Sequence, residues 1–405
     1  MRDVAVVGVG MTKFGKFLER SNKDLVREAV EDALADAGIK GNELEAAYVG
    51  NSMAGILTGQ EAIRGQVTLA PLGIDTIPIV NVENACARSS TAIHLAWLAV
   101  ASGQYDCVLA VGFEKLFHAD KAMSFKALSA AMDVESGIDF LTDFSARCGN
   151  DPMIGEGAGI NRSIFMDMYS YYARAYMKEC GLTQEHFAKI AVKSHKIAAL
   201  NPRSQYRREV TLGEVLASGD VVFPLTRMMC APMGDGAAAA VLCSKPVAAR
   251  LTTSPIWVAG STLGSGSLRG DGDFVTAAIA PKAYAAAGIG PGEIDVVEVH
   301  DTTSPAEIVF LIQLGLCPPG NAARWIEEGQ TGLEGAMPTN PSGGLQSKGH
   351  PVGATGTAQI FEIVNQLKGR SGPRQVKDPK VGMTQNGGGV LGPGAAAMAI
   401  HIFKR

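Results

Sequence analysis

Short apolar runs alternate along the chain with segments in which apolar residues recur every three or four positions. Val4–Gly8 and Ile256–Gly260 are rich in β-branched and small residues and predict buried strands. Residues 183–199 carry the helical repeat. Alternating strands and helices predict an α/β fold with mainly parallel strands, because parallel strands need crossover connections and helices cover the sheet faces.

The chain also contains an internal duplication. Residues 33–50 align without gaps with residues 283–300, and each segment reads as a helix end, an acidic turn and a buried strand. Gly38 and Gly288 stand where helices commonly end in a glycine. Further along, each copy has a helix followed by a strand: the helices begin near Thr91 and Thr357, and the strands cover 106–112 and 380–387. Each copy then closes with a strand of small residues, after Gly234 in the first copy and after Gly392 in the second. We expect two βαβαβ halves that share a layered α-β-α-β-α core around a pseudo-two-fold axis.

One copy carries a long insertion before its closing strand. We expect residues 1–115 and 231–250 to form the N-terminal half, residues 251–405 the C-terminal half, and residues 116–230 an inserted loop domain. Long insertions on a rigid scaffold commonly form binding loops or lids. Met and Tyr concentrate at 165–172, a pattern open to both helix packing and substrate contact.

Composition narrows the class of protein. The 405 residues are 46% hydrophobic, which suffices for a buried core and excludes a disordered chain. The net charge of −4 does not favour nucleic acid or an anionic membrane as a partner. The seven cysteines are scattered without zinc-type spacing, which predicts reduced thiols and no metal in this chain. Without a membrane-spanning apolar stretch or a secretory leader, we expect a cytoplasmic protein.

Corresponding turns of the two copies carry candidate catalytic residues. Cys86 lies just before the helix near Thr91, where backbone N–H groups and the helix dipole should lower the pKa of its thiol. His350 lies in a glycine-rich turn before the corresponding helix of the second copy. If the two turns face each other, His350 can act as a base for Cys86 or as a cation that stabilises its thiolate. A small buried cysteine and a structural histidine are the alternatives.

Two further segments of the second copy follow predicted strands. His300 ends a buried strand, where open α/β sheets usually bind ligands. After it, Ser304 as N-cap, Pro305 and Glu307 predict a helix start, and capping does not require an imidazole, so we interpret His300 as functional. Gly387 opens a run of three glycines whose N–H groups can bind an oxyanion, although such runs are also common in plain turns.

Together these motifs resemble the thiolase superfamily over nearly the whole chain. The resembling elements are Asn-Ala-Cys86, the segment from Cys230 into the small-residue strand, His300-Asp301, Gly-His350-Pro and the terminal Asn-Gly-Gly-Gly. The His-Asp pair is similar to the sterol-carrier-protein-type and archaeal branch, whereas the common degradative and biosynthetic thiolases have Asn-Glu at that position.

The resemblance implies a role for each residue. Cys86 would take the acyl group as a thioester after activation by His350. His300 and His350 would hold the oxygen of the CoA thioester whose enolate forms, and the N–H groups of Cys86 and Gly387 would hold the oxygen of the transferred acyl group. CoA would be the co-substrate, with no tightly bound cofactor. The candidates for binding its phosphates are Arg203, Arg207 and Arg208, with a solvated charged loop as the alternative.

The chain departs from the family at a second cysteine, which moves the proton at the substrate α-carbon. In the common branch this cysteine stands at the position of Gln385 in the present chain. In the sterol-carrier-type branch it stands at the position of Thr302. Neither an amide nor an aliphatic hydroxyl titrates near neutral pH. Either a histidine takes on both tasks, or the enolate forms unusually easily, or the reaction differs.

The missing thiol and the Met- and Tyr-rich insertion favour a bulky 3-oxoacyl-CoA. One candidate is benzoylsuccinyl-CoA from aromatic degradation, which would give benzoyl-CoA and succinyl-CoA. The resembling branch includes two-component enzymes with a small partner that contains zinc and an OB fold. The resemblance also implies a homodimer or a higher oligomer.

Three other functions fit the same residues. A ketosynthase-like condensing enzyme also uses a cysteine with two histidines, although the Asn-Ala-Cys86 motif and the absence of a Gly-Thr pair after His300 argue against it. A retro-aldolase subunit would need no acyl-enzyme. A non-catalytic acyl-CoA-binding subunit would explain the missing thiols at Thr302 and Gln385.

Overall fold

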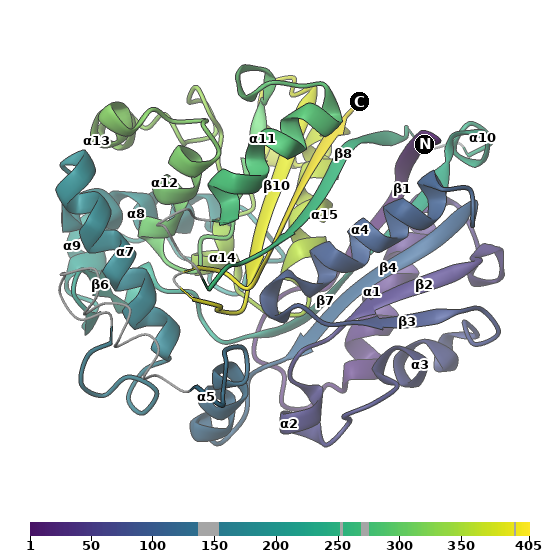
Figure 1. The fold of residues 1–405 in the computed structure, drawn as a ribbon, viewed down its shortest axis with the longest axis horizontal. Helices are drawn as coiled ribbons and strands as arrows, with labels where there is room; N and C mark the ends of the chain where they lie inside the picture. The colour runs from purple at the N-terminus through teal and green to yellow at the C-terminus, as the bar shows by residue number, and fades with distance from the viewer. Residues whose placement is uncertain (137–153, 252–253, 269–274, 393) are drawn as a thin grey trace.

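Figure 1 shows the computed structural model, in which two strand-rich halves meet near the N-terminus. The structure describes residues 1–136, 154–251, 254–268, 275–392 and 394–405. Part of the predicted insertion, with Cys148, lies outside these ranges.

Nine strands form one mixed sheet. The N-terminal half contributes β1 (Val4–Met11), β2 (Ala46–Gly50), β3 (Ile79–Val82), β4 (Cys107–Lys115) and β7 (Asp235–Ser244). The C-terminal half contributes β8 (Ile256–Ser265), β9 (Val296–Glu298), β10 (Val381–Gly388) and β11 (Ala397–Lys404). The order is β3-β2-β4-β7-β1-β8-β11-β10-β9. Outward from the central β1–β8 pair, both halves repeat the same order, as the duplication predicts.

The expectation of mainly parallel strands is wrong. Three neighbouring pairs are parallel, β2 with β3, β2 with β4, and β9 with β10. The other five pairs are antiparallel. The closing strands β7 and β11 cause the difference, because each inserts between the first strand of its half and β4 or β10 and runs against both neighbours.

Helices lie on both faces of each half-sheet. The outer faces are covered by α1 (Asn22–Ala37) and α11 (Val275–Ala287), while α4 (Arg88–Ala101) and α15 (Thr355–Leu367) pack between the halves. The core therefore has the expected α-β-α-β-α layers. Gly38 ends α1 in the left-handed conformation, with a φ of 72°, as its position predicts.

The other described helices are shorter or belong to the insertion. They are α2 (Ala54–Thr58), α3 (Arg64–Leu69), α5 (Lys121–Ser129), α7 (Ile164–Cys180), α8 (Gln184–Ala199), α9 (Leu212–Leu216), α10 (Lys245–Ala248), α12 (Ser304–Gln313), α13 (Ala322–Glu327) and α14 (Gly344–Lys348). The insertion also forms a hairpin of β5 (Asp220–Val222) and β6 (Leu225–Thr226). Among the described helices, none is long and apolar enough to cross a membrane.

The insertion packs on the half to which it does not belong. α7 and α8 interrupt the N-terminal half of the sequence, yet they contact α12 of the C-terminal half and share its hydrophobic core. In Figure 1 they lie beside α12, away from β1 to β4. The helix predicted over 183–199 is confirmed, and the side chain of Thr183 caps it.

The predicted cap of α12 is wrong. Thr303 is the N-cap residue, and Ser304 is the first residue of the helix. Glu307 does not form a capping box, because its carboxylate is buried against α8, where it accepts a hydrogen bond from Lys193 at 2.5 Å. The residues that resembled a local helix start therefore serve a contact between the insertion and the C-terminal half.

The N-terminal ends of α4 and α15 approach each other closely between the two halves. A Cβ atom at Gly356 would lie 2.1 Å from Ser90 Oγ and 2.6 Å from the backbone nitrogen of Ser90. One residue on, the backbone N–H of Thr357 donates to Ser89 Oγ at 3.1 Å. This contact requires glycine at position 356 and brings together the turns that precede the two helices.

We predict that Gly356→Ala destabilises the protein, because overpacking at such a contact costs about 1–3 kcal/mol. Gly292→Ala is the control, since a Cβ atom there meets nothing within 4 Å. Urea unfolding should separate the two variants. Equal free energies of unfolding would show that the two helices can move apart without cost.

Candidate active site

Cys86 lies in a strained 3₁₀ turn between β3 and α4. Ala85, directly before it, has a φ of 47°, in the left-handed region that residues with a side chain rarely adopt. The carboxylate of Glu83 accepts a hydrogen bond from the backbone N–H of Ala85 at 2.9 Å, and Asn84 donates to Thr91 Oγ1 at 3.0 Å. These bonds hold the turn in the shape that presents the sulfur.

The glycines at the end of β10 pack against this turn. A Cβ atom at Gly388 would lie 2.3 Å from the backbone nitrogen of Ala87. The backbone N–H of Gly389 is directed at the Cys86 sulfur. Gly387 lines the same cavity as Cys86, as its predicted oxyanion role requires.

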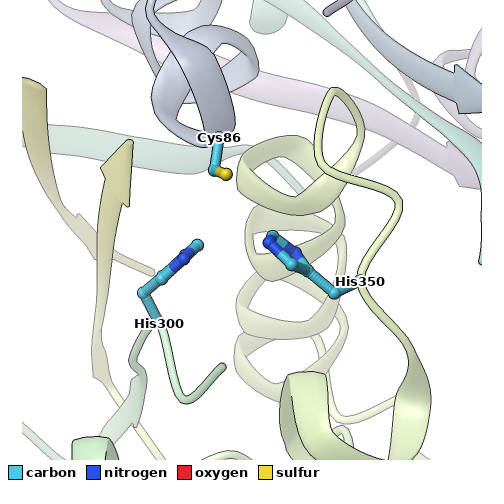
Figure 2. A group of neighbouring side chains, drawn as sticks. All are labelled: Cys86, His300 and His350. Carbon is cyan, nitrogen blue, oxygen red and sulfur yellow. The ribbon is translucent and has the colours of Figure 1, made fainter. Parts of the chain in front are cut away.

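The structure brings together the three predicted catalytic residues. Figure 2 shows Cys86 pointing down from its turn towards His300 and His350, which lie on either side of the sulfur. The sulfur and the ligand nitrogens of both rings all lie within 4.8 Å of one another. The two imidazoles meet edge to face, with centroids 5.0 Å apart.

The hydrogen bonds around His350 determine which of its ring nitrogens can accept a proton. Its Nδ1 lies 2.7 Å from Thr355 Oγ1, and the Thr355 hydroxyl donates its single proton to the carbonyl oxygen of Pro351 at 3.0 Å. Nδ1 must therefore carry a proton and donate it to Thr355. This leaves Nε2 with a lone pair that can accept a proton.

The hydrogen bonds around His300 give the opposite tautomer. Asn386 Nδ2 lies 2.7 Å from His300 Nδ1, while Asn386 Oδ1 accepts from Ser90 Oγ at 2.9 Å. With the amide oriented by this network, its N–H donates and His300 Nδ1 accepts. Nε2 of His300 then carries the proton and acts as a hydrogen-bond donor.

Burial keeps all three groups neutral at rest. It raises the pKa of the Cys86 thiol to about 11, so the expected lowering by the helix start is wrong. The nearby Arg88 and the backbone N–H groups favour the thiolate, but desolvation outweighs them. Burial lowers the pKa of His300 to about 3 and that of His350 well below 6.5. The thiolate must therefore form by proton transfer during the reaction.

Sequence reasoning missed a buried cation beside the thiol. The Arg88 side chain is 1% exposed and contacts Glu83, and its charge also interacts with Glu114 and Cys86. Glu114 accepts from Asn51 Nδ2 at 3.0 Å, and burial raises the pKa of its carboxyl to about 7. The signal available in the sequence was Arg88 itself, a charged residue two positions after Cys86.

Asp301 fixes the segment that leads to His350. Its carboxylate accepts from the backbone N–H of Leu345 at 2.7 Å and from Gln346 Nε2 at 3.0 Å, at the start of α14. Burial, and then the charge of Glu307, raises the pKa of Asp301 to about 8. Asp301 thus ties the residue after His300 to the helix before His350.

The two positions where the family resemblance predicted a second cysteine differ in their surroundings. Gln385 is a structural link, since its Oε1 accepts from the backbone N–H of His300 at 2.9 Å and its Nε2 donates to Thr276 at 3.2 Å. Thr302 instead faces the cavity and accepts a hydrogen bond from the Tyr169 hydroxyl at 3.2 Å.

A cavity of about 820 Å³ opens over the three residues. Large apolar side chains line it, mostly from the insertion, and they include Phe125, Phe165, Met166, Met168, Tyr169, Tyr172 and Met398. The helix-packing interpretation of the Met and Tyr segment is confirmed, because Met168 packs in a hydrophobic cluster with Ile164 and Val390. Substrate contact stays a prediction, with which the cavity lining agrees.

Cations at the cavity come from several segments. Those that line it include Lys16, Lys121, Arg207, Arg208 and Arg227, all exposed. Arg203 lies elsewhere, since it donates to the carbonyl oxygen of Met11, contacts Asp32 at 3.4 Å and stacks on Phe361. It joins the insertion to β1, α1 and α15, so the structure separates it from the predicted phosphate-binding cluster.

A cysteine with two histidines at this spacing is also a common zinc-ligand set. Zinc would need an unprotonated nitrogen from each ring. The Asn386 contact instead leaves a proton on His300 Nε2. The observed network therefore favours acid–base chemistry over metal ligation.

Comparisons with known proteins identify related families over most of the chain. The family models "Thiolase, N-terminal domain" and "Thiolase C-terminal domain-like" match residues 4–215 and 271–404. The acetyl-CoA acetyltransferase of Methanothermobacter thermautotrophicus is 39% identical over 411 residues, covering 100% of both chains. Sterol carrier protein 2 of Bos taurus is 37% identical over 414 residues, covering 99% of this chain and 72% of its own length.

Two solved structures are similar in fold. The Ltp2–ChsH2(DUF35) aldolase aligns with a TM-score of 0.79 at 24% identity, over 99% of this chain and 97% of that one. Human mitochondrial 3-ketoacyl-CoA thiolase in complex with CoA aligns with a TM-score of 0.70 at 16% identity, over 100% and 98%.

The buried imidazoles predict a loss of stability in acid. Because the pKa of His300 is about 3 in the folded protein and 6.5 ordinarily, the unfolded chain binds this proton first as the pH falls. The stabilisation is complete above about pH 6.5 and is lost towards pH 3. In this window His300→Gln should reduce the slope of unfolding free energy against pH by up to about 1.4 kcal/mol per unit.

Urea unfolding between pH 4.5 and 7 measures this slope. His350→Gln should act in the same direction, because burial also lowers the pKa of His350. The double variant should show the sum of the two effects. An unchanged slope in all three variants would mean that the two rings bind protons as readily in the folded protein as in the unfolded chain.

Proposed function

The chain belongs to the thiolase family and is a thiolase-type acyl-CoA acyltransferase, and from this premise we propose that it cleaves a bulky 3-oxoacyl-CoA with CoA through an acyl-enzyme on Cys86. The observation that carries the proposal is the convergence of Cys86 with two imidazoles of opposite tautomers. One ring accepts a proton from the nucleophile, and the other donates a hydrogen bond to a developing oxyanion.

In the first half-reaction, His350 Nε2 takes the proton of Cys86 as the sulfur attacks the 3-oxo carbon. The bond between C2 and C3 breaks, and its electron pair stays on the CoA-bearing fragment as an enolate. The Nε2–H of His300 donates to the thioester oxygen of this enolate, beside the newly protonated His350. The N–H groups of Cys86 and Gly387 stabilise the oxygen of the acyl group on the sulfur.

In the second half-reaction, free CoA loses its thiol proton and attacks the thioester on Cys86 as a thiolate; over the whole cycle this proton balances the one that the enolate takes up at C2. The sulfur leaves as a thiolate and recovers its proton from His350 Nε2. The acyl group has then moved to CoA, and both groups are again neutral. Their pKa directions support this cycle, because burial favours a neutral resting pair.

The cavity supports a bulky acyl group. Its volume of about 820 Å³ is larger than an acetyl group needs. Met and aromatic side chains of α7 line it, and aromatic walls favour an aromatic ring in the substrate. Benzoylsuccinyl-CoA, cleaved to benzoyl-CoA and succinyl-CoA, is the candidate that we favour within this class. The carboxylate of its succinyl part that is not bound to CoA would need a cation, and the candidates are the cavity-lining arginines Arg207, Arg208 and Arg227.

CoA would bind with its phosphates at the cations of the cavity. Arg207 is exposed there, and Arg208 lies beside it in an exposed ion pair with Glu214. Human mitochondrial 3-ketoacyl-CoA thiolase, which shares the fold, has been solved with CoA. Arg203 is not among the CoA-binding residues that we propose, because its side chain is bound to Met11 and Asp32.

We further propose that the protein works as an assembly. At one edge of the sheet β3 pairs with β2 alone among the described strands, and Val80 on it is 42% exposed, which suits pairing with a second copy in a homodimer or higher oligomer. The Ltp2 aldolase is a complex with a DUF35 protein, which supports a small zinc- and OB-fold-containing partner for this chain too. Light scattering with and without such a partner tests both points.

A retro-aldolase is the second candidate function. Thr302 and Gln385 stand where relatives have a second thiol, and the aldolase shares the fold at a TM-score of 0.79. Such a reaction would break a carbon–carbon bond without an acyl-enzyme. The two functions therefore differ in their need for Cys86.

We predict that Cys86→Ser abolishes thiolysis of benzoylsuccinyl-CoA, because a hydroxyl is a far weaker nucleophile than a thiolate. Mass spectrometry of the wild type quenched without free CoA should find one benzoyl group on Cys86. Cys230→Ser, which alters another thiol of the same cavity, is the control and should keep both signals. Full turnover by Cys86→Ser, or an unmodified Cys86 in the wild type, would favour the retro-aldolase.

We predict that Arg207→Glu and Arg208→Glu each raise the KM for CoA about 10-fold or more, because each change removes one charge-assisted contact and adds repulsion. The value of kcat should change little, since neither side chain touches the reacting atoms. Lys23→Glu makes the same charge change on the exposed side of α1 and is the control. An unchanged KM in both arginine variants would remove these residues from the CoA site.

A further inference from the structure

We propose that Tyr169 is a catalytic acid–base residue that supplies the proton to the substrate α-carbon in place of the missing second cysteine, an inference that rests on the proposed thiolysis. The residue belongs to α7 of the insertion and lines the active-site cavity. In the sequence it belongs to the Met- and Tyr-rich segment 165–172, but no motif there gives Tyr169 a role of its own.

Contacts of its own helix and of the C-terminal half hold Tyr169 in position. Its neighbours Met168 and Ser170 are buried and anchor that turn of α7. The Tyr169 hydroxyl reaches the C-terminal half and donates to Thr302 Oγ1 at 3.2 Å. Thr302 is itself fixed, since its N–H donates to the carbonyl oxygen of His300 at 3.0 Å and its carbonyl oxygen accepts from the N–H of Ala231 at 2.8 Å.

This contact places a phenol where the sterol-carrier-type branch has a thiol. Thr302 follows the His-Asp pair directly, and the phenol that it binds interacts electrostatically with Cys86. Gln385 cannot take the task, because both ends of its amide are engaged and an amide does not titrate. Of the two groups in the contact, the phenol is by far the stronger acid.

The proton balance of the first half-reaction is then complete. Cleavage of the bond between C2 and C3 leaves an electron pair on C2 of the enolate. The Tyr169 O–H bond breaks, its proton forms the new C2–H bond, and the phenolate keeps the electron pair. The proton of Cys86 meanwhile stays on His350 Nε2, so the enzyme then holds an acyl-thioester, a phenolate and an imidazolium.

The second half-reaction restores both groups. The phenolate of Tyr169 takes the proton of the CoA thiol, which then attacks the acyl-enzyme as a thiolate. Cys86 leaves and takes its proton from His350. No other acid, base or oxidant is needed, and the net change is transfer of the acyl group to CoA.

The buried setting suits this exchange. Burial raises the pKa of the Tyr169 phenol and lowers that of His350, so both are neutral at rest. Reaction creates one anion and one cation together, and the cavity gains no net charge. The Thr302 hydroxyl can turn and donate to the phenolate, and this hydrogen bond favours the charged form of Tyr169.

The test compares two reactions of the holoenzyme with any partner present. Thiolysis of benzoylsuccinyl-CoA needs the α-carbon proton, whereas transfer of the benzoyl group from benzoyl-CoA to Cys86 breaks no carbon–carbon bond. Tyr169→Phe should lower thiolysis about 100-fold or more, the range for general acid catalysis, and lower the benzoyl transfer less than 10-fold. Exchange of the α-protons of succinyl-CoA in deuterium oxide should fall with thiolysis.

The matched control is Tyr176→Phe, the same chemical change two turns along α7, where the hydroxyl accepts from Gln313. It should leave both reactions within threefold of the wild type. The double variant Tyr169→Phe/Thr302→Cys returns a thiol to the position of the branch cysteine, and it should recover thiolysis and α-proton exchange at least 10-fold.

Two results would overturn the inference. Thiolysis by Tyr169→Phe within threefold of the wild type would show that another group delivers the proton. Equal loss of thiolysis and benzoyl transfer would show a structural role. Both differ from failure of the proposed function, in which the wild type itself forms no acyl-enzyme on Cys86 and the role of Tyr169 falls with it.

Discussion

The contact between the N-terminal ends of α4 and α15 is the constraint on which the site depends. Gly356 lets α15 approach the backbone of Ser90, and Thr357 donates to Ser89 across the pseudo-two-fold axis. Each helix follows a turn that carries a reactive residue, so the same contact brings Cys86 and His350 together. Neither half alone contains both residues, and the duplicated fold is what makes the pair possible.

The second requirement is desolvation. Both rings are buried and the half-buried Cys86 sulfur lies at the wall of the cavity, and desolvation leaves none of the three groups charged at rest. What distinguishes the two imidazoles is the partner of each Nδ1. The hydroxyl of Thr355 accepts a hydrogen bond from Nδ1 of His350, whereas the amide of Asn386 donates one to Nδ1 of His300. Two chemically identical side chains thereby become a base and a hydrogen-bond donor.

The insertion completes the site from the outside. It leaves the N-terminal half but packs on α12 of the C-terminal half, through buried contacts such as that between Lys193 and Glu307. This arrangement closes a cavity over Cys86 and sets Tyr169 against Thr302. The insertion therefore contributes polar as well as apolar side chains to the wall of the cavity.

The sequence by itself determined the duplicated α/β architecture and its layers, and it singled out Cys86, His300 and His350 as candidates, because glycine stops, apolar periodicity and motifs at helix starts are local signals. Tertiary structure decided the rest. The strand directions depend on where β7 and β11 insert, and the environment of Arg203 depends on Met11 and Asp32. The raised pKa of Cys86 and the tautomers of both rings arise from burial and from partners distant in sequence, which no local pattern records.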